Sequence, residues 1–147
     1  EVRSGGRRIG FLIVDLATGD RGFLAKRGYE SQARVGSYGV VVSDVLRVGV
    51  PALRRAITEA DVIGIDEIGP MELAVEELRD AIIRALSSGK PVVGVIHRRL
   101  RLRDPQVYRL ASSLGPVIEV SVENRDRLAT EAVGYAVQIA SAAGCRA

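Results

Sequence analysis

From Pro51 onwards, strand-like apolar runs alternate with segments of helical periodicity, and this alternation restricts the folds that the chain can adopt. Strands are predicted at three short apolar runs, residues 61–67, 91–97 and 116–121. Helices are predicted between and after them, over 51–60, from Pro70 to Gly89, over 104–114 and over 124–143. Strands separated by helices pair in parallel through right-handed crossovers. The pattern therefore predicts an α/β fold with a mainly parallel sheet.

The first third of the chain predicts β-structure with a different connection. Residues 8–16 and 21–26 are mostly apolar and enclose the turn-forming cluster 17–20. Two strands joined by a short turn form an antiparallel hairpin. Residues 34–42 form an apolar run interrupted by glycines, which predicts a further strand or a loop that ends in one. An N-terminal β-hairpin is therefore expected in front of the parallel sheet.

The bulk properties are those of one ordinary globular domain over residues 1–147. The chain is 47% hydrophobic and 27% charged, with a net charge of +3. It has no apolar run long enough to cross a bilayer and no secretory signal, and the lone Cys145 has no partner for an internal disulfide. We therefore expect a cytoplasmic protein without a membrane partner, as a monomer or a weak homo-oligomer. The charge suits a nucleotide, whereas the scarcity of aromatic residues disfavours nucleic acid.

Polar side chains follow each predicted parallel strand, and the carboxyl ends of such strands meet at the ligand-binding edge of a sheet. The first strand ends in Asp66 and Glu67, which is the Walker B pattern of an apolar strand followed by two acids. In that pattern the first carboxylate is held near Mg²⁺ and the second polarises the attacking water. The alternative is that both acids only stabilise the N-terminus of the following helix, by about 0.3–1 kcal/mol.

His97 closes the second of these strands, and Arg98 and Arg99 follow it. All three are candidate sensors of a γ-phosphate, the arginines because a guanidinium can neutralise charge that develops on the phosphate. The alternatives are a histidine that is hydrogen-bonded at a strand end and an arginine-rich loop that is merely solvated.

Four separated runs of residues carry a resemblance to a known family. They are, in chain order, 1–11 (EVRSGGRRIGF), 65–73 (IDEIGPMEL), 95–99 (VIHRR) and 121–128 (SVENRDRL). Together they resemble the small nucleoside-triphosphatase family known from thermophiles, whose animal relative is cancer-related nucleoside-triphosphatase. The resemblance covers essentially the whole chain. It implies a three-layer, RecA-like P-loop fold and Mg²⁺-dependent hydrolysis of nucleoside triphosphates, ATP and GTP among them.

The resemblance also implies roles for particular residues. Asp66 matches the acid associated with Mg²⁺, which acts through a coordinated water, and Glu67 matches the catalytic base. Asn124 and Arg125 stand where a contact to the nucleotide base is expected. A second nucleotide-contacting segment matches Val62, Ile63, Gly64, Ile65, Asp66, Glu67, Ile68 and Gly69.

One departure from the family is large. Its members begin with a strand, a G-x-x-G-x-G-K-[ST] loop and a helix, and these precede the residues that match 1–11. Gly89-Lys90 is no substitute, because it closes a helix instead of opening one. We therefore expect the first strand, the P-loop and the first helix to be absent from this chain. The missing strand belongs between those ending at His97 and Ser121, so unpaired edges and exposed apolar side chains are expected, with lower stability.

Three functions remain open from the sequence. Hydrolysis of the β–γ bond of nucleoside triphosphates is the leading one, although the chain alone is expected to be impaired without its phosphate-gripping loop. A small-molecule or nucleotide kinase uses the same site and needs an acceptor pocket, for which residues 34–38 are a candidate. A nucleotide- or nucleic-acid-binding module without catalysis is the third.

Overall fold

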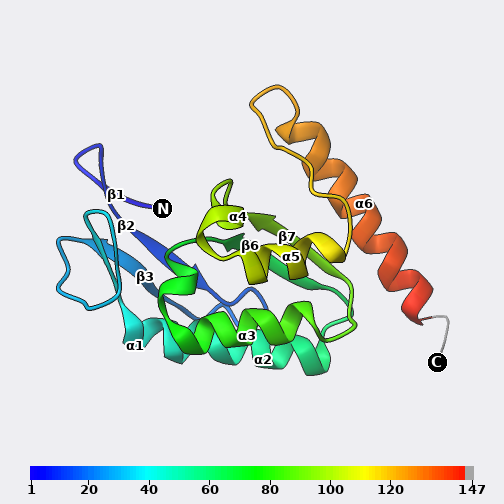
Figure 1. Ribbon diagram of the computed structural model, residues 1–147, viewed down its shortest axis with the longest axis horizontal. Coiled ribbons are helices and arrows are strands. Elements are labelled where there is room, and N and C mark those ends of the chain that lie inside the picture. Colours follow the sequence, from blue (N-terminus) through cyan, green and yellow to red (C-terminus); the bar gives the residue numbers. More distant parts are fainter. Residues whose placement is uncertain (145–147) are drawn as a thin grey trace.

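The computed structural model describes residues 1–144, and Cys145 lies outside this part of the chain. The strands are β1 (Val2–Ser4), β2 (Arg7–Val14), β3 (Arg21–Arg27), β4 (Arg34–Val35), β5 (Tyr38–Val40), β6 (Ile63–Ile68) and β7 (Val92–Ile96). The helical segments are α1 (Val42–Asp44), η1 (Val45–Gly49), α2 (Val50–Glu59), η2 (Glu72–Ala74), α3 (Glu76–Leu86), α4 (Leu100–Arg103), α5 (Pro105–Ser113) and α6 (Arg125–Gly144). Figure 1 shows their arrangement.

An antiparallel sheet fills the N-terminal part of the molecule, with the strand order β1-β2-β3-β5-β4. β2 and β3 pair from Gly10 opposite Lys26 to Val14 opposite Arg21. This pairing confirms the predicted N-terminal hairpin. β4 and β5 extend the sheet with a second, shorter hairpin.

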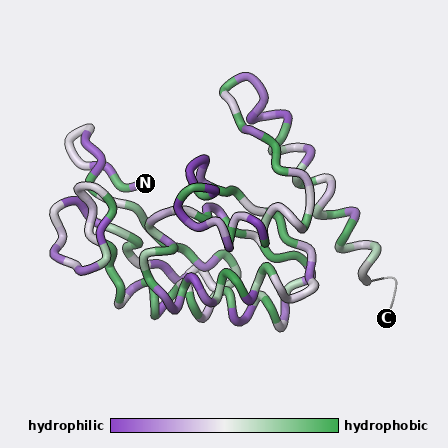
Figure 2. Tube along the Cα trace, viewed as in Figure 1, coloured by the Kyte–Doolittle hydropathy of each residue, from purple (hydrophilic) through white to green (hydrophobic). Residues whose placement is uncertain are grey.

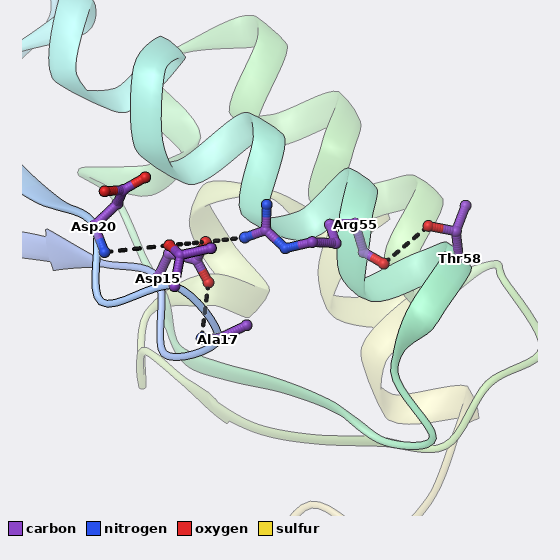
Figure 3. A network of polar contacts seen from close by, with 6 residues as sticks. Asp15, Ala17, Asp20, Arg55 and Thr58 are labelled. Atoms are coloured by element: carbon purple, nitrogen blue, oxygen red, sulfur yellow. Dashed lines mark hydrogen bonds and ion pairs between the residues drawn. The ribbon is translucent and has the colours of Figure 1, made fainter.

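A buried carboxylate fastens the turn between β2 and β3 to helix α2 (Figure 3). Asp15 is 7% exposed, and its side chain accepts hydrogen bonds from the backbone N–H of Ala17 at 3.0 Å and the hydroxyl of Thr18 at 2.8 Å. Arg55 of α2 forms an ion pair with the same carboxylate. Every buried polar atom here has a partner, which is the condition for burying a charge without a large penalty.

A second, parallel pair of strands follows the helical segment that ends at Glu59. β6 pairs with β7 from Ile63 opposite Val92 to Ile68 opposite Ile96, and α3 makes the connection between them. α2 and α3 run side by side along one side of the molecule (Figure 1). The predicted strand–helix–strand unit is therefore confirmed for residues 63–96.

The helix predicted from Pro70 begins later than expected. A short 3₁₀ turn, Glu72–Ala74, comes first, and Val75 is then extended with φ −111° and ψ 116° before α3 begins at Glu76. Valine favours extended backbone, and its side chain here is 3% exposed. The extended, buried Val75 thus separates the 3₁₀ turn from α3.

The core lies between the antiparallel sheet, β6 and the helices. Its central helix is α3, whose predicted apolar face is buried at Leu78, Ile82, Ala85 and Leu86. The hydrophobic cluster joins side chains from β3, β5, η1, β6, α3, α4 and α5, among them Leu24, Val40, Val45, Ile68, Leu100 and Val107. The end of β6 is therefore anchored by packing on several elements.

The prediction of a third parallel strand at 116–121 is wrong, because the described residues contain no strand there. This segment pairs with no strand there, and it leaves Val117, Ile118 and Val120 exposed. An apolar run of strand-forming residues becomes a strand only when a neighbouring strand pairs with it. In the described part β7 pairs only with β6, and no strand lies between β7 and this segment. The expected unpaired edge is present at β7, where Val95 is exposed. The mainly parallel sheet is corrected to a five-stranded antiparallel sheet beside a two-stranded parallel one.

α6 stands apart from the other elements and makes only isolated contacts with them (Figure 1). Figure 2 shows hydrophobic residues in α6 and in the segment before it, away from the core. Val133, Tyr135 and Val137 are exposed on this helix. Among the helices of residues 1–144, none combines the length and apolarity that a membrane crossing requires.

Candidate active site

The acidic end of β6 is held by the parallel pairing with β7. Asp66 lies opposite Val95 in the ladder, and the register is irregular between Asp66 and Ile68. The peptide bond between Asp66 and Glu67 is cis. Asp66 is exposed and Glu67 is half-buried, and neither forms an ion pair with another described residue. Two carboxylates are thus left available at the end of a fixed strand.

Gly69 is the point on which the surrounding side chains converge. A Cβ atom at this position would lie 2.8 Å from Oε1 of Glu67, 3.0 Å from Oε2 of Glu72 and 3.3 Å from Cβ of His97. A side chain at this position would displace the carboxylates of Glu67 and Glu72 from where they lie. The glycine therefore leaves room for both carboxylates close to His97.

Glu72 is a site residue that the sequence reasoning missed. The pKa of its carboxyl is raised from 4.5 to about 7, mainly by burial and also by the nearby charges of Glu67 and Asp66. Hydrogen bonds from the backbone N–H groups of Glu72 and Gly69 act in the opposite direction. The turn Glu72–Ala74 brings the side chain back over Gly69. A glutamate early in a predicted helix is ordinarily assigned to the helix N-terminus, so only the break at Val75 could have revealed it.

His97 completes the cluster from the neighbouring strand. Its backbone N–H donates to the carbonyl of Ile68 at 3.0 Å, which fixes it against the turn that follows β6. Its Nδ1 accepts a hydrogen bond from the backbone N–H of Arg99 at 3.2 Å. Arg98 and Arg99 are exposed. The structure thus brings His97 to the acidic strand end, as two adjacent parallel strands should.

Asn124 and Arg125 are not brought to this edge. Nδ2 of Asn124 donates to the carbonyl of Glu119 at 2.9 Å, and its Oδ1 accepts from the backbone N–H of Ser121 at 2.8 Å. The side chain therefore fastens the preceding loop instead of facing β6. Arg125 begins α6, which stands away from β6 and β7 (Figure 1). Their part in contacting a nucleotide base stays a prediction.

A family model described as NTPase matches residues 1–133, which is most of the chain. The chain belongs to this NTPase family. Its Gly69-centred cluster lies wholly inside the matched residues.

Relatives in this NTPase family are named nucleoside-triphosphatase THEP1. The protein of Thermofilum pendens is 52% identical over 99 residues, which are 67% of this chain and 54% of the relative. That of Thermococcus kodakarensis is 49% identical over 129 residues, covering 86% of this chain and 68% of the relative. That of Methanopyrus kandleri is 41% identical over 140 residues, covering 94% and 76%. The chain thus spans about half the length of the Thermofilum pendens relative.

A solved member of the family has a similar fold. The crystal structure of THEP1 from the hyperthermophile Aquifex aeolicus matches with a TM-score of 0.68 at 34% sequence identity. The match covers 81% of this chain and 72% of that one. The α/β fold described above therefore resembles that of the THEP1 structure.

The residues at the end of β6 suit the Mg²⁺ ion expected in an NTPase. Mg²⁺ binds through one or two carboxylates and takes its other ligands from water and substrate phosphates. Asp66 offers an exposed carboxylate of this kind, and Glu67 follows it. Within residues 1–144 no group of three or more histidine, cysteine or acidic side chains forms a metal cage. An exposed carboxylate with a second acid beside it is compatible with this mode of binding.

Proposed function

We propose that the domain formed by these residues hydrolyses nucleoside triphosphates to the diphosphate and phosphate. The observation that carries the proposal is the cluster at Gly69, where Glu67 and His97 meet at the carboxyl end of a parallel strand pair. Relatives named nucleoside-triphosphatase over most of the chain support it. Because the chain spans only part of their length, the activity and the substrate of the whole protein are part of the proposal.

In the proposed reaction Glu67 is the general base. Its carboxylate accepts a proton as the oxygen of a water molecule bonds to the γ-phosphorus, and the bond from that phosphorus to the β–γ bridging oxygen breaks. Asp66 would hold Mg²⁺ through one of the ion's waters. When bound, the ion neutralises negative charge on the phosphate oxygens. His97 faces the same turn and is proposed to sense the γ-phosphate, with Arg98 or Arg99 balancing the charge that develops on it.

We further propose a RecA-like P-loop domain in which a strand–loop–helix unit completes the 147 residues. These residues contain no G-x-x-x-x-G-K-[ST] sequence, whose backbone N–H groups and lysine grip the phosphates. Two features support a place for the unit's strand: β7 has an open edge with Val95 43% exposed, and the apolar segment 116–122 leaves Ile118 56% exposed. A strand between them would pair with both.

The test is phosphate release from Mg-ATP and Mg-GTP by the chain extended with an N-terminal P-loop unit. Glu67→Gln is expected to lower turnover by roughly 10²–10⁴, the usual contribution of a positioned base. The matched control is Glu59→Gln, an exposed glutamate at the end of α2, which should leave turnover unchanged. Equal turnover in the Glu67→Gln variant and the parent would refute the assignment of the base. The unextended chain should show far slower release than the extended one.

A further inference from the structure

A cavity of about 460 Å³ lies beside the turn that follows β6, with His97 and Pro70 among its lining residues. It is open to solvent on one side and is lined by segments from the β4–β5 hairpin, the turn after β6, α3 and α4. Its volume is within the range of small-molecule sites. The lining residues are Arg34, Val35, Pro70, Leu73, Ala74, Arg79, His97, Arg99, Arg103 and Asp104.

The polar part of the lining is strongly basic, because its single carboxylate is already engaged. Nε of Arg79 donates to Oδ2 of Asp104 at 2.7 Å, and Oδ1 of Asp104 accepts from the backbone N–H of Val107 at 3.0 Å. The hydrogen bond from Arg79 lowers the pKa of Asp104, which therefore stays ionised. Asp104 thus neutralises Arg79 and leaves the other arginines uncompensated.

Three arginines of the lining form no ion pair with any residue of the described chain: Arg34, Arg99 and Arg103. Nη1 of Arg34 donates a hydrogen bond to the carbonyl of Tyr29 at 3.2 Å, and the other N–H groups of the guanidinium remain available as donors. Arg34 comes from β4, and Arg99 and Arg103 come from the two ends of the α4 segment. Guanidinium groups that line one cavity favour an anion with several acceptor oxygens, which a phosphate provides.

The remaining wall of the cavity is apolar and consists of Val35, Pro70, Leu73 and Ala74. Inorganic phosphate alone gains nothing from such a wall. A molecule that joins a phosphate to an uncharged organic part gains both the ionic contacts and the burial of apolar area.

We propose that this cavity binds a phosphomonoester, with the phosphate facing Arg34, Arg99 and Arg103 and the organic part against Val35 and Leu73. The inference goes beyond nucleoside-triphosphate hydrolysis, since it assigns a smaller ligand to a cavity that reaches from His97 to Arg34. The cavity shares His97 and Arg99 with the proposed hydrolysis, whereas Arg34 and Arg103 have no part in that reaction and therefore carry the test.

His97 provides a site-specific measurement, because it lines the cavity and is the single histidine in the sequence. Its imidazole proton resonances are followed while the 147-residue chain is titrated with phenyl phosphate, without nucleotide or Mg²⁺. Separate titrations use inorganic phosphate and benzyl alcohol. Phenyl phosphate is expected to saturate the site at lower concentration than either, since it alone satisfies both walls.

Arg34→Gln and Arg103→Gln are each expected to weaken phenyl phosphate binding at least about tenfold, as loss of a charged hydrogen bond does. Arg101→Gln is the matched control, since it removes the same charge from α4 at a position outside the lining. Arg34→Lys, which keeps the charge, should retain more affinity than Arg34→Gln. The thermal transition of each variant establishes that it is folded.

Two results would overturn the proposal. One is phenyl phosphate binding that is no tighter than that of benzyl alcohol, which leaves no role for the arginines. The other is an equal loss of affinity in Arg101→Gln and Arg103→Gln, which reduces the effect to the net charge of the molecule. Because the titrations contain no nucleoside triphosphate, neither result bears on the proposed hydrolysis.

Discussion

Three carboxylates, those of Asp66, Glu67 and Glu72, lie near the end of β6, and the pKa of Glu72 is raised. Its pKa is about 7, above the ordinary 4.5, because burial and the charges of Glu67 and Asp66 disfavour ionisation. Between these two values the folded state holds a proton that the unfolded state has lost. The free energy of unfolding therefore decreases as pH rises from about 4.5 to about 7, by up to about 3 kcal/mol from this group.

Glu72→Gln is expected to remove this pH dependence, because an amide cannot ionise. The variant should be more stable than the parent at pH 8, by up to about 3 kcal/mol, with little difference at pH 4.5. Urea unfolding at both pH values, in the presence of a chelator, measures the change. Glu77→Gln, an exposed glutamate on α3, is the control and should keep the parent's pH response. A Glu72→Gln variant with that same response would contradict the assignment.

At this scale the sequence indicates part of the site and not the rest. Asp66 and Glu67 are predictable because an apolar strand that ends in two acids is a pattern of adjacent residues. His97 is predictable as a neighbour because parallel strands end together. Glu72 is not, since its approach to Gly69 depends on a 3₁₀ turn and an extended Val75 that local periodicity does not encode.

Among the elements, α2 and the β2–β3 turn are joined by the ion pair of Arg55 with Asp15. The carboxylate is nearly inaccessible, so removing the guanidinium leaves a buried charge with only its two remaining hydrogen bonds. An uncompensated buried charge is costly, unlike a missing surface ion pair.

Arg55→Ala is therefore expected to destabilise the molecule by about 1–3 kcal/mol. The neighbouring Arg54 is exposed and forms no ion pair with the rest of the described chain, so Arg54→Ala should cost about 0.5 kcal/mol or less. Equilibrium urea unfolding of the two variants compares these effects. Equal losses of stability would mean that the link between α2 and the hairpin contributes nothing beyond helix propensity.

The sequence predicts those elements whose pattern depends only on residues that are close together along the chain. The β2–β3 hairpin is specified by its turn, and α3 by its apolar face. The segment 116–121 has the composition of a strand, yet pairing requires a partner that composition cannot supply. The predicted start of α3 failed for a related reason, because burial of Val75 in the core is a tertiary effect.

The whole molecule consists of a packed body that ends at α5 and a helix that stands apart from it. α6 has 20 residues and makes only isolated contacts with the body, so tertiary packing adds little to its stability. In proteins most of the stability of a helix comes from such packing.

Amide hydrogens of α6 are accordingly expected to exchange much faster than those of α3, which is buried along one face. Hydrogen–deuterium exchange at low protein concentration measures both helices in one experiment, with α3 as the internal reference. Dilution matters because the exposed Val133 and Val137 favour association between copies. Equal protection of the two helices in the dilute sample would show that α6 is packed in solution.

We expect the two sheets to form at different times during folding. β2 and β3 are joined by a short turn, so they can pair before any other element is in place. β6 and β7 become neighbours only when α3 has packed across them, and closing that longer connection costs more chain entropy. Asp66 and His97 therefore meet late. A chain in which only the β2–β3 hairpin has formed contains all the residues of the candidate site, but Asp66 and His97 are not yet close to each other.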